Sequence, residues 1–295
     1  MKRARIIYNP TSGREGFKKE LPEVLRRLEE AGFEASAHAT TGEGDAAKAA
    51  EVAVERQFDV VIAAGGDGTI NEVINGLAEK PNRPKLGVIP AGTTNDFARA
   101  IRVSKGIHKA LDVIIAGHTR ALDIGRVNNQ YFINIAGGGK LTELTYEVPS
   151  KLKTMLGQLA YYLKGIEMLP SIRPTYVEIE YDGTLFKGDI MLFLLSNSNS
   201  VGGFEKLAPA ARMDDGLFDL IILKKTNIAE FVRLASHALR GQHIHDKQVI
   251  YTQANQVKVY TEEKMQLNLD GEYGGLLPGE FVNLHKHIEF FVPEE

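Results

Sequence analysis

One apolar run constrains the fold of this chain more than any other feature. Residues 59–64, Asp-Val-Val-Ile-Ala-Ala, show no polar alternation, which is typical of a strand buried on both faces of a parallel sheet. Strand and helix patterns alternate around it through the first 120 or so residues. The other predicted strands are Ile6–Tyr8, Glu34–Ala39 and Leu86–Ile89, and the predicted helices are Phe17–Leu28 (interrupted by Pro22), Asp45–Gln57 and Asn71–Lys80. This order predicts a doubly wound α/β domain.

The pattern changes near Asp123, where strand signals take over. Alternating residues on both sides of Asp182-Gly183 predict a hairpin. Its strands are Tyr176–Tyr181 and Phe186–Ser196; further strands are predicted at Phe218–Leu223, Val257–Thr261 and Gln266–Asp270, and helices at Lys151–Met168 and Ile228–Arg240. The run Gly137-Gly138-Gly139-Lys140 indicates a flexible backbone. We predict an α/β domain over 1–122 and a mainly β (sandwich) domain over 123–295, whose last residues pack back on the first.

Composition excludes several classes of protein. The formal net charge of −3 gives no bulk argument for nucleic-acid binding, and we expect none. There are no cysteines, so disulfides and thiolate metal sites are excluded, which fits a reducing cytoplasm. No apolar run approaches the roughly 18 residues of a membrane-spanning helix.

The strongest candidate for a functional loop is Gly65-Gly66-Asp67-Gly68-Thr69, which directly follows the buried strand. Ligands of open α/β sheets bind at the carboxyl ends of strands. Glycines let a phosphate approach the backbone, and a helix beginning near Thr69 would point its free N–H groups at an anion. Asp67 would act on a phosphate through Mg²⁺ or its waters. A tight turn before a helix explains the same residues, and the motif alone does not separate the two interpretations.

Two more polar loops follow predicted strands. Residues 90–99, Pro-Ala-Gly-Thr-Thr-Asn-Asp-Phe-Ala-Arg, come after the fourth strand, and Asn9–Arg14 comes after the first. Thr94 or Asn95 acting only as a helix cap is the alternative for the 90–99 loop. Because the carboxyl ends of parallel strands meet at one edge of a sheet, the three loops together predict a single site.

Ordered motifs run along nearly the whole chain. They are Asn9-Pro10-Thr11-Ser12-Gly13, Gly65–Val73, Pro90–Arg99, Asp123-Ile124-Gly125, Ser196-Asn197-Ser198, Ala208–Asp219 and Asp270-Gly271-Glu272. In this order they resemble the diacylglycerol kinase catalytic family, which includes sphingosine and ceramide kinases, and above all its soluble bacterial members. The resemblance implies an NAD kinase/diacylglycerol kinase-like fold with a nucleotide-binding first domain and a lipid-substrate second domain. It implies ATP- and Mg²⁺-dependent phosphorylation of diacylglycerol to phosphatidic acid, recycling diacylglycerol into phospholipid synthesis.

The resemblance also implies the role of individual residues. ATP would be bound by Asn9, Pro10, Thr11, Ser12, Gly13, Arg14, Thr40, Gly66, Asp67, Gly68, Thr69, Ile70, Asn71, Glu72 and Thr93. Arg14 stands where the family favours Lys, which keeps the charge but changes the hydrogen-bond geometry. An acidic network around the magnesium of ATP would consist of Asp67, Asp96 and Asp123. Glu272 would accept the proton of the lipid hydroxyl, with Asp270 beside it in the catalytic group, although residues 270–272 also fit a plain hairpin turn.

Three further expectations rest on the resemblance. A second, structural Mg²⁺ would take the carboxylate of Asp215 and the carbonyls of Arg212 and Leu217, whereas the residues alone favour a turn. Lys164, in a basic amphipathic stretch, would face a membrane, although a packed helix with solvated lysines explains the stretch equally well. The protein would be a cytoplasmic homodimer, associated peripherally with the inner face of the membrane, where it meets its lipid substrate.

Alternatives to diacylglycerol phosphorylation stay open. Another lipid alcohol, such as a sphingoid base or ceramide, is one. NAD kinase also combines a GGDG loop with an α/β and a β domain, but residues 92–99 favour a lipid kinase. The third alternative is a nucleotide-regulated binding protein without turnover. The presence of four candidate catalytic carboxylates argues against it, and these are Asp67, Asp96, Asp123 and Glu272. The pairs His243-x-His245 and His285-x-His287 lack a carboxylate cluster and are interpreted as structural or solvated histidines.

Overall fold

The computed structural model describes residues 1–139, 173–199, 206–238 and 240–294. The chain divides into two compact units, residues 1–123 with 286–295 and residues 124–285. Strand β15 (Gly279–Phe291) belongs to both, since its second half pairs in parallel with β4 (Lys85–Pro90) through Phe290 and Leu86. The last ten residues therefore complete the first unit.

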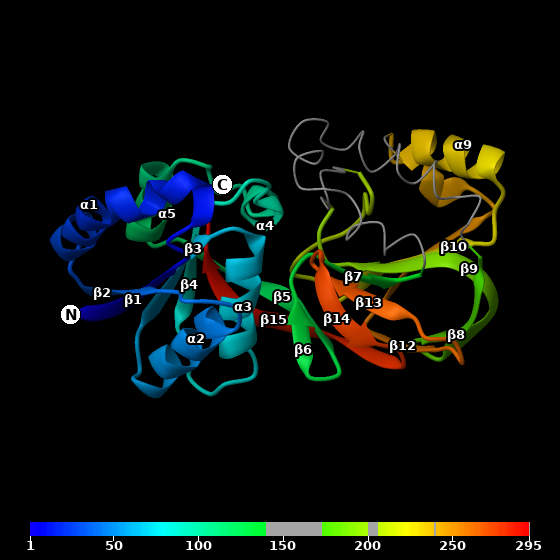
Figure 1. Ribbon diagram of the computed structural model, residues 1–295, viewed down its shortest axis with the longest axis horizontal. Helices are drawn as coiled ribbons and strands as arrows, with labels where there is room; N and C mark the ends of the chain where they lie inside the picture. The colour runs from blue at the N-terminus through cyan, green and yellow to red at the C-terminus, as the bar shows by residue number, and fades with distance from the viewer. Residues whose placement is uncertain (140–172, 200–205, 239, 295) are drawn as a thin grey trace. The chain divides into compact units, whose positions relative to one another are not determined.

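A parallel sheet in the order β2-β1-β3-β4, with the end of β15 beside β4, forms the centre of the first unit. Its other elements are β1 (Lys2–Tyr8), η1 (Ser12–Glu15), α1 (Gly16–Glu30), β2 (Phe33–Ala39), α2 (Asp45–Glu55), β3 (Val60–Gly65), α3 (Asp67–Leu77), α4 (Asp96–Ala100) and α5 (Ile107–Ala116). Helices α1 and α5 lie on one side of these strands, and α2 and α3 on the other (Figure 1). Every residue of β3 is buried, so the predicted doubly wound α/β fold is confirmed.

Two predicted helices of this unit differ from the structure, and helix α5 was not predicted. Helix α1 runs unbroken through Pro22, because Phe17, Val24 and Leu28 are buried on one face on both sides of the proline. Helix α3 begins at Asp67, earlier than predicted, because its first turn carries polar and small residues and the apolar periodicity starts only at Ile70.

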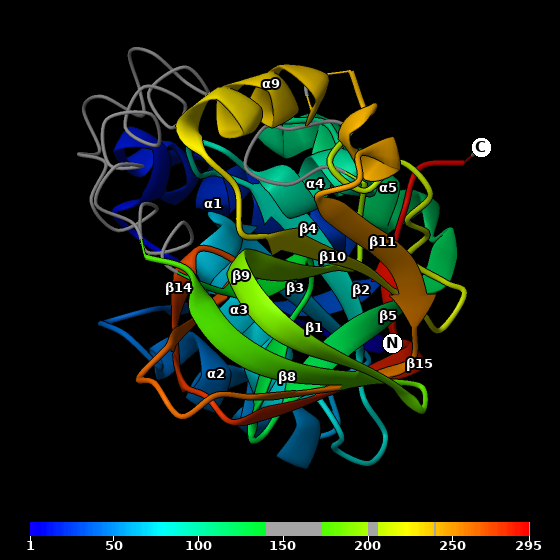
Figure 2. The same ribbon diagram turned by 90° about the vertical axis from the view of Figure 1, so that its right-hand side faces the viewer.

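The second unit is built from antiparallel strands around one apolar core. Its elements are β5 (Thr119–Val127), which starts in the first unit, β6 (Gln130–Phe132), β7 (Ile135–Gly138), β8 (Thr175–Tyr181), β9 (Thr184–Ser196), β10 (Phe218–Lys224), α9 (Ile228–Ala238), η3 (His243–His245), β11 (Val249–Ala254), β12 (Gln256–Tyr260), β13 (Gln266–Leu269), β14 (Glu272–Leu276) and the first half of β15. The long strand β9 pairs with β8, β10 and β7 (Figure 2). Phe132, Phe193, Phe218 and Phe281 meet in the core with ring centroids 5.5–6.5 Å apart. The predicted mainly β, sandwich-like second domain is confirmed.

Local predictions in the second unit have mixed outcomes. The Asp182-Gly183 hairpin turn is confirmed, with both residues at positive φ. The prediction of a flexible backbone at 137–139 is wrong for Gly137 and Gly138, which are buried in strand β7. A Cβ on Gly138 would lie 2.7 Å from the ring of Phe193, so glycine is what lets that ring pack. The predicted helix at 151–168 lies outside the described residues. In the described ranges, no helix is long and apolar enough to cross a membrane.

Candidate functional site

Three loops meet at the carboxyl ends of β1, β3 and β4 in the first unit. A Cβ on Gly13, in the first loop, would lie 2.4 Å from the carbonyl oxygen of Ala91, in the third. A Cβ on Gly92 would lie 2.5 Å from the Cα of Gly66, in the second. The glycines at these positions therefore allow backbone to pack on backbone, and the structure brings the three loops together on one rim.

The first loop is shaped by its own side chains. The Asn9 side-chain oxygen accepts hydrogen bonds from the N–H (3.0 Å) and the hydroxyl (2.8 Å) of Thr11. The N–H of Asn9 donates to the carbonyl of Ala64, which ties this loop to β3. The loop then enters η1, where the side chain of Arg14 lies outside what the structure describes.

A hollow lies beside this rim, lined by Asn9, Pro10, Thr11, Thr40, Thr41, Gly42, Glu43, Ala46, Thr69 and Glu72. Six of these ten residues belong to the predicted ATP site. Four were not predicted, and they are Thr41, Gly42, Glu43 and Ala46. Of the other predicted residues, Ile70 is fully buried and its N–H donates to Gly66, so this side chain contributes to packing.

Two carboxylates organise the loop that precedes α2. Asp45 accepts hydrogen bonds from the N–H (2.8 Å) and hydroxyl (2.9 Å) of Thr41 and lies 3.3 Å from the ring of His38. The Thr41 N–H holds the pKa of the Asp45 carboxyl below its usual range. Glu72, from α3, accepts the N–H of Ala46 at 3.1 Å, at the start of α2. These bonds fix one wall of the hollow.

The second and third loops are joined through Asp67. Its two carboxylate oxygens accept the N–H groups of Asp96 (3.1 Å) and Phe97 (3.2 Å) at the start of α4. Asp96 in turn pairs with Arg99 at 2.9 Å. The alternative of a simple cap at 94–95 is wrong for Asn95, whose side chain makes no capping bond. It instead accepts the N–H of Gly92 (2.9 Å) and donates to the Gly92 carbonyl (2.8 Å), closing the loop on itself.

The third member of the predicted acidic network is Asp123, in β5. Asp123 is buried and accepts the N–H of Lys286 at 2.6 Å. Among the residues that the structure describes, no three histidine, cysteine, aspartate or glutamate side chains form a group suited to a metal ion. Each oxygen of Asp67 accepts one N–H and keeps a further acceptor position, which suits water-mediated contact with a cation. The Asp67 carboxylate oxygens therefore fit a hydrated Mg²⁺ that is bound to the phosphates of a nucleotide, rather than a Mg²⁺ ion coordinated entirely by protein ligands.

In the second unit, Asp270 and Gly271 form the turn between β13 and β14, and Glu272 is the exposed first residue of β14. The plain hairpin turn expected from the residues alone is therefore present. The carboxylate of Asp270 accepts backbone N–H groups from Ile133, Asn134 and Ile135. Its oxygens are thus engaged with the protein's own backbone.

The remaining candidate positions of the second unit have identifiable structural partners. Asp215 accepts the N–H of Leu217 at 3.1 Å around Gly216, which has positive φ, so the turn expected from the residues alone is present. Arg212 lies 3.5 Å from Asp214. His243 is buried with Nε2 2.9 Å from the carbonyl of Leu207, which confirms a structural histidine. Lys164 lies outside the described residues.

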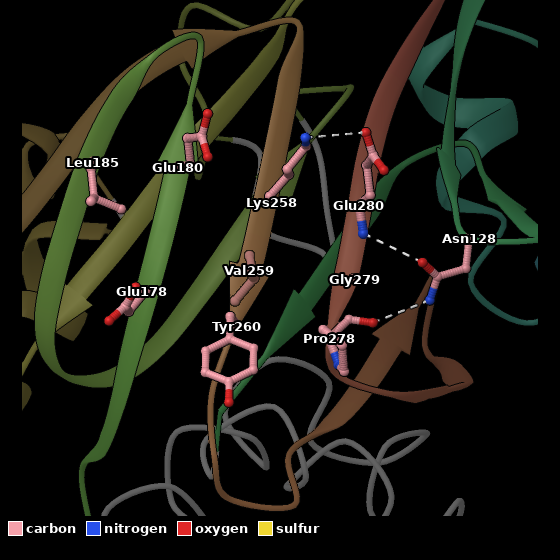
Figure 3. Close-up of a pocket in the computed structure, with 10 residues that line it drawn as sticks. All are labelled: Asn128, Glu178, Glu180, Leu185, Lys258, Val259, Tyr260, Pro278, Gly279 and Glu280. Atoms are coloured by element: carbon pink, nitrogen blue, oxygen red, sulfur yellow. Dashed lines mark hydrogen bonds and ion pairs between the residues drawn. The ribbon is translucent and has the colours of Figure 1, made fainter.

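A second hollow, on the face of β8, β12 and β15, contains none of the motif residues (Figure 3). Its charged lining consists of Glu178, Glu180, Glu280 and Lys258, and Lys258 is 3.8 Å from Glu280. The hollow of the first unit is instead lined by the first loop, through Asn9, Pro10 and Thr11, and by Thr69 from the start of α3. Because free N–H groups at a helix start bind phosphate, the rim of the first unit is the candidate nucleotide site.

Comparison with known proteins agrees with this geometry. Residues 3–127 match the diacylglycerol kinase catalytic domain, and residues 144–291 match the YegS C-terminal NAD kinase beta sandwich-like domain. The chain is 70% identical to a diacylglycerol kinase of Bacillus subtilis, covering 100% of this chain and 98% of that protein. It is 57% identical to one of Staphylococcus epidermidis, covering 100% and 93%. A crystal structure of a diacylglycerol kinase from Bacillus anthracis matches with a TM-score of 0.83 at 28% identity, covering 99% of this chain and 97% of that chain.

Proposed function

This chain belongs to the diacylglycerol kinase family of lipid kinases, and from that premise we propose that it transfers the γ-phosphate of ATP, in the presence of Mg²⁺, to the hydroxyl of diacylglycerol. The products are phosphatidic acid and ADP. The observation that supports the nucleotide part is the meeting of three strand-end loops beside one polar hollow.

The two sides of that hollow suit different parts of ATP. Gly66, Gly68 and the free N–H groups at the start of α3 offer donors to phosphate oxygens. Glu43 and Glu72 line the hollow with carboxylates, which accept hydrogen bonds and repel phosphate. We infer that ribose hydroxyls or the base amino group face these two carboxylates, while the phosphates extend toward the glycines.

The reaction moves one phosphoryl group and one proton. The lipid hydroxyl oxygen attacks the γ-phosphorus, the bond from that phosphorus to the β,γ-bridging oxygen breaks, and ADP leaves. Glu272 accepts the hydroxyl proton. Positioning and charge neutralisation account for most of the acceleration, and a base adds about 10²–10⁴-fold.

We propose that Asp67 and Asp96 hold the magnesium of ATP through water, with Asp123 as the third carboxylate of the network. When bound, the cation would neutralise charge on the phosphate oxygens. The Asp67 side chain has a second role in this proposal, since it also fixes the start of α4 through two N–H groups. Asp67→Ala is therefore expected to remove activity.

Labelled γ-phosphate tests the reaction class. Diacylglycerol in mixed micelles, ceramide and NAD are offered side by side with ATP and Mg²⁺, and phosphatidic acid is the expected labelled product. Labelled NADP would overturn the substrate assignment and leave the nucleotide site standing. Labelled ceramide phosphate alone would keep a lipid kinase and change its substrate.

A matched pair of variants tests the base. Glu272→Gln is expected to lower kcat by about 10²–10⁴-fold while the KM for ATP stays within about twofold. Glu262→Gln, an exposed carboxylate in the same unit, serves as the control and is expected to keep wild-type turnover. Wild-type turnover in Glu272→Gln would refute the assignment.

The remaining expectations are proposals with separate assays. A structural Mg²⁺ at Arg212, Asp215 and Leu217 predicts that Asp215→Asn abolishes one magnesium binding event in calorimetry. Contact with anionic membranes through Lys164 predicts weaker liposome binding in Lys164→Glu. A homodimer predicts twice the chain mass in light scattering.

A further inference from the structure

Several hydrogen bonds hold the turn that directly precedes Glu272. Asp270 and Gly271, at φ 51° and 97°, form the two-residue connection between β13 and β14. The Asn268 side-chain oxygen accepts the N–H of Gly271 at 2.9 Å. Leu269 and Glu272 are paired directly across the hairpin, so the conformation of these two turn residues fixes where Glu272 leaves the backbone.

Asp270 fastens this turn to the segment that leads into β7. Its Oδ2 accepts the N–H of Ile133 at 2.8 Å, and its Oδ1 accepts those of Asn134 (2.8 Å) and Ile135 (2.9 Å). The N–H of Asp270 donates back to the carbonyl of Ile135 at 2.9 Å. Bonds from N–H groups to a carboxylate are about twice as strong as those between neutral groups.

The segment that Asp270 binds is itself anchored in a buried polar network. The backbone N–H of Asn197 donates to the carbonyl of Asn134 at 2.8 Å, and its side-chain amide donates to the carbonyl of Ile133 at 3.2 Å. Asn283 donates to the side-chain oxygen of Asn197 at 3.1 Å. Asn197 and Asn283 are both buried. The Glu272 turn is thus connected through Asp270 to groups that have little freedom to move.

We propose that Asp270 is a positioning residue for Glu272, acting on the reaction only through the conformation of the turn. The proposal rests on the proposed function, in which Glu272 accepts the proton of the lipid hydroxyl. A base must lie within hydrogen-bond reach of the proton that it removes, and small displacements of such groups reduce rates strongly. Releasing the carboxylate clamp would leave the hairpin folded and let Glu272 move away from its working position.

The same unit contains a matched turn without a candidate base. Asp182 and Gly183 connect β8 and β9 at φ 43° and 83°. The carboxylate of Asp182 accepts the N–H groups of Asn255 (3.0 Å) and Gln256 (3.1 Å) from a neighbouring segment. The residue after this turn is Thr184, which belongs to no motif. Asp182 therefore serves as the control for a purely structural clamp.

The experiment compares Asp270→Asn with Asp182→Asn in the full chain. Asparagine tolerates positive φ, so both turns keep their backbone while each loses the charge and one acceptor oxygen. For each variant, kcat and KM for ATP and for diacylglycerol in mixed micelles are measured with the melting temperature. Asp270→Asn is expected to lower kcat by about 10–100-fold with KM for ATP within about twofold. Asp182→Asn is expected to lose melting temperature without losing kcat.

Either of two results would overturn the proposal: a normal kcat in Asp270→Asn, or an equal loss of kcat in both variants. If Asp270→Asn does not fold, Asn268→Ala replaces it, since it removes one bond of the same turn and is expected to lower kcat about fivefold. Normal kcat in a folded Asn268→Ala would then refute the positioning role. Glu272→Gln distinguishes failure of the proposed function from failure of the positioning role. Wild-type turnover in Glu272→Gln would refute the role of Glu272 as the base. A low kcat in Glu272→Gln together with a normal kcat in Asp270→Asn would refute only the positioning role of Asp270.

Discussion

Replacing Asn95 by alanine is expected to open the 92–97 loop of the nucleotide site. Asn95 is buried at 3% exposure and has φ 54°, and its side chain makes two hydrogen bonds with the backbone of Gly92. Losing two such bonds costs about 2 kcal/mol. Alanine in the left-handed region costs a further 1–2 kcal/mol or so. The total, about 3–4 kcal/mol, is a large fraction of the stability of an ordinary domain.

Two further variants separate these contributions. Asn95→Gly loses the hydrogen bonds but accepts positive φ, so it is expected to cost about 1 kcal/mol less than Asn95→Ala. Asn128→Ala is the matched control, because Asn128 also has positive φ and two backbone hydrogen bonds, but is exposed and makes longer bonds of 3.3 and 3.4 Å. The control is expected to cost less than Asn95→Ala and to leave ATP affinity unchanged.

Amide hydrogen exchange measures the opening directly. The Gly92 amide, which is bonded to Asn95, is expected to lose about 100–1,000-fold in protection in Asn95→Ala, since each 1.4 kcal/mol is tenfold. Weaker ATP binding is expected to accompany it. Wild-type protection of Gly92 would refute the assignment of loop shape to Asn95. Equal loss in the alanine and glycine variants would refute the contribution of backbone conformation.

Three shorter predictions concern other described residues. Gly92→Ala places a Cβ 2.5 Å from the Cα of Gly66, which must push two loops apart, so the KM for ATP is expected to rise about 10–100-fold in steady-state kinetics. Asp45→Asn weakens the two hydrogen bonds that Thr41 donates to this side chain, so it is expected to raise the KM for ATP about fivefold, with kcat unchanged. Burial lowers the pKa of His243 from 6.5, so the unfolded chain binds the proton more tightly and stability is lost as pH falls below about 6.5; His243→Gln is expected to flatten that slope in urea titrations.

The sequence predicted the fold best where the polarity of the side chains matches their burial in the structure. Strand β3 is apolar throughout and buried throughout, and the β8–β9 hairpin shows both alternation and an Asp-Gly turn. Prediction of secondary structure failed where a strand consists largely of glycine. Strand β7 contains Gly137 and Gly138, which leave no alternation of side chains to detect, and the missing side chain of Gly138 makes room for Phe193. The start of α3 was misplaced because its first turn carries polar and small residues and the apolar periodicity starts only at Ile70.

The sequence predicted where the loops of the candidate site meet, but not most of the hydrogen bonds that shape them. Strand ends followed by polar loops predicted where the loops would meet, since that follows from parallel topology. The wall formed by Thr41 and Glu43 was not predicted. Asp45 shapes this wall by accepting the N–H of Thr41, but in the sequence a charged residue at this position indicates only the solvated start of a helix. Partners of Asp270 lie about 135 residues away in the chain, so no local pattern marks them.

Several motif residues that suggest chemistry also determine the shape of their own loops. Asn9 and Asn95 close two loops of the rim, and Asp67 fixes the start of α4 while being the proposed contact of the magnesium of ATP. A loop without helical or strand pairing leaves backbone N–H groups to be satisfied by nearby side-chain oxygens. Loss of activity in an alanine variant at these positions therefore does not by itself identify a catalytic group. Asp67→Asn keeps an acceptor for one N–H and removes the charge, so folded α4 with lost turnover would assign Asp67 to the chemistry, whereas weakened α4 would assign it first to the loop.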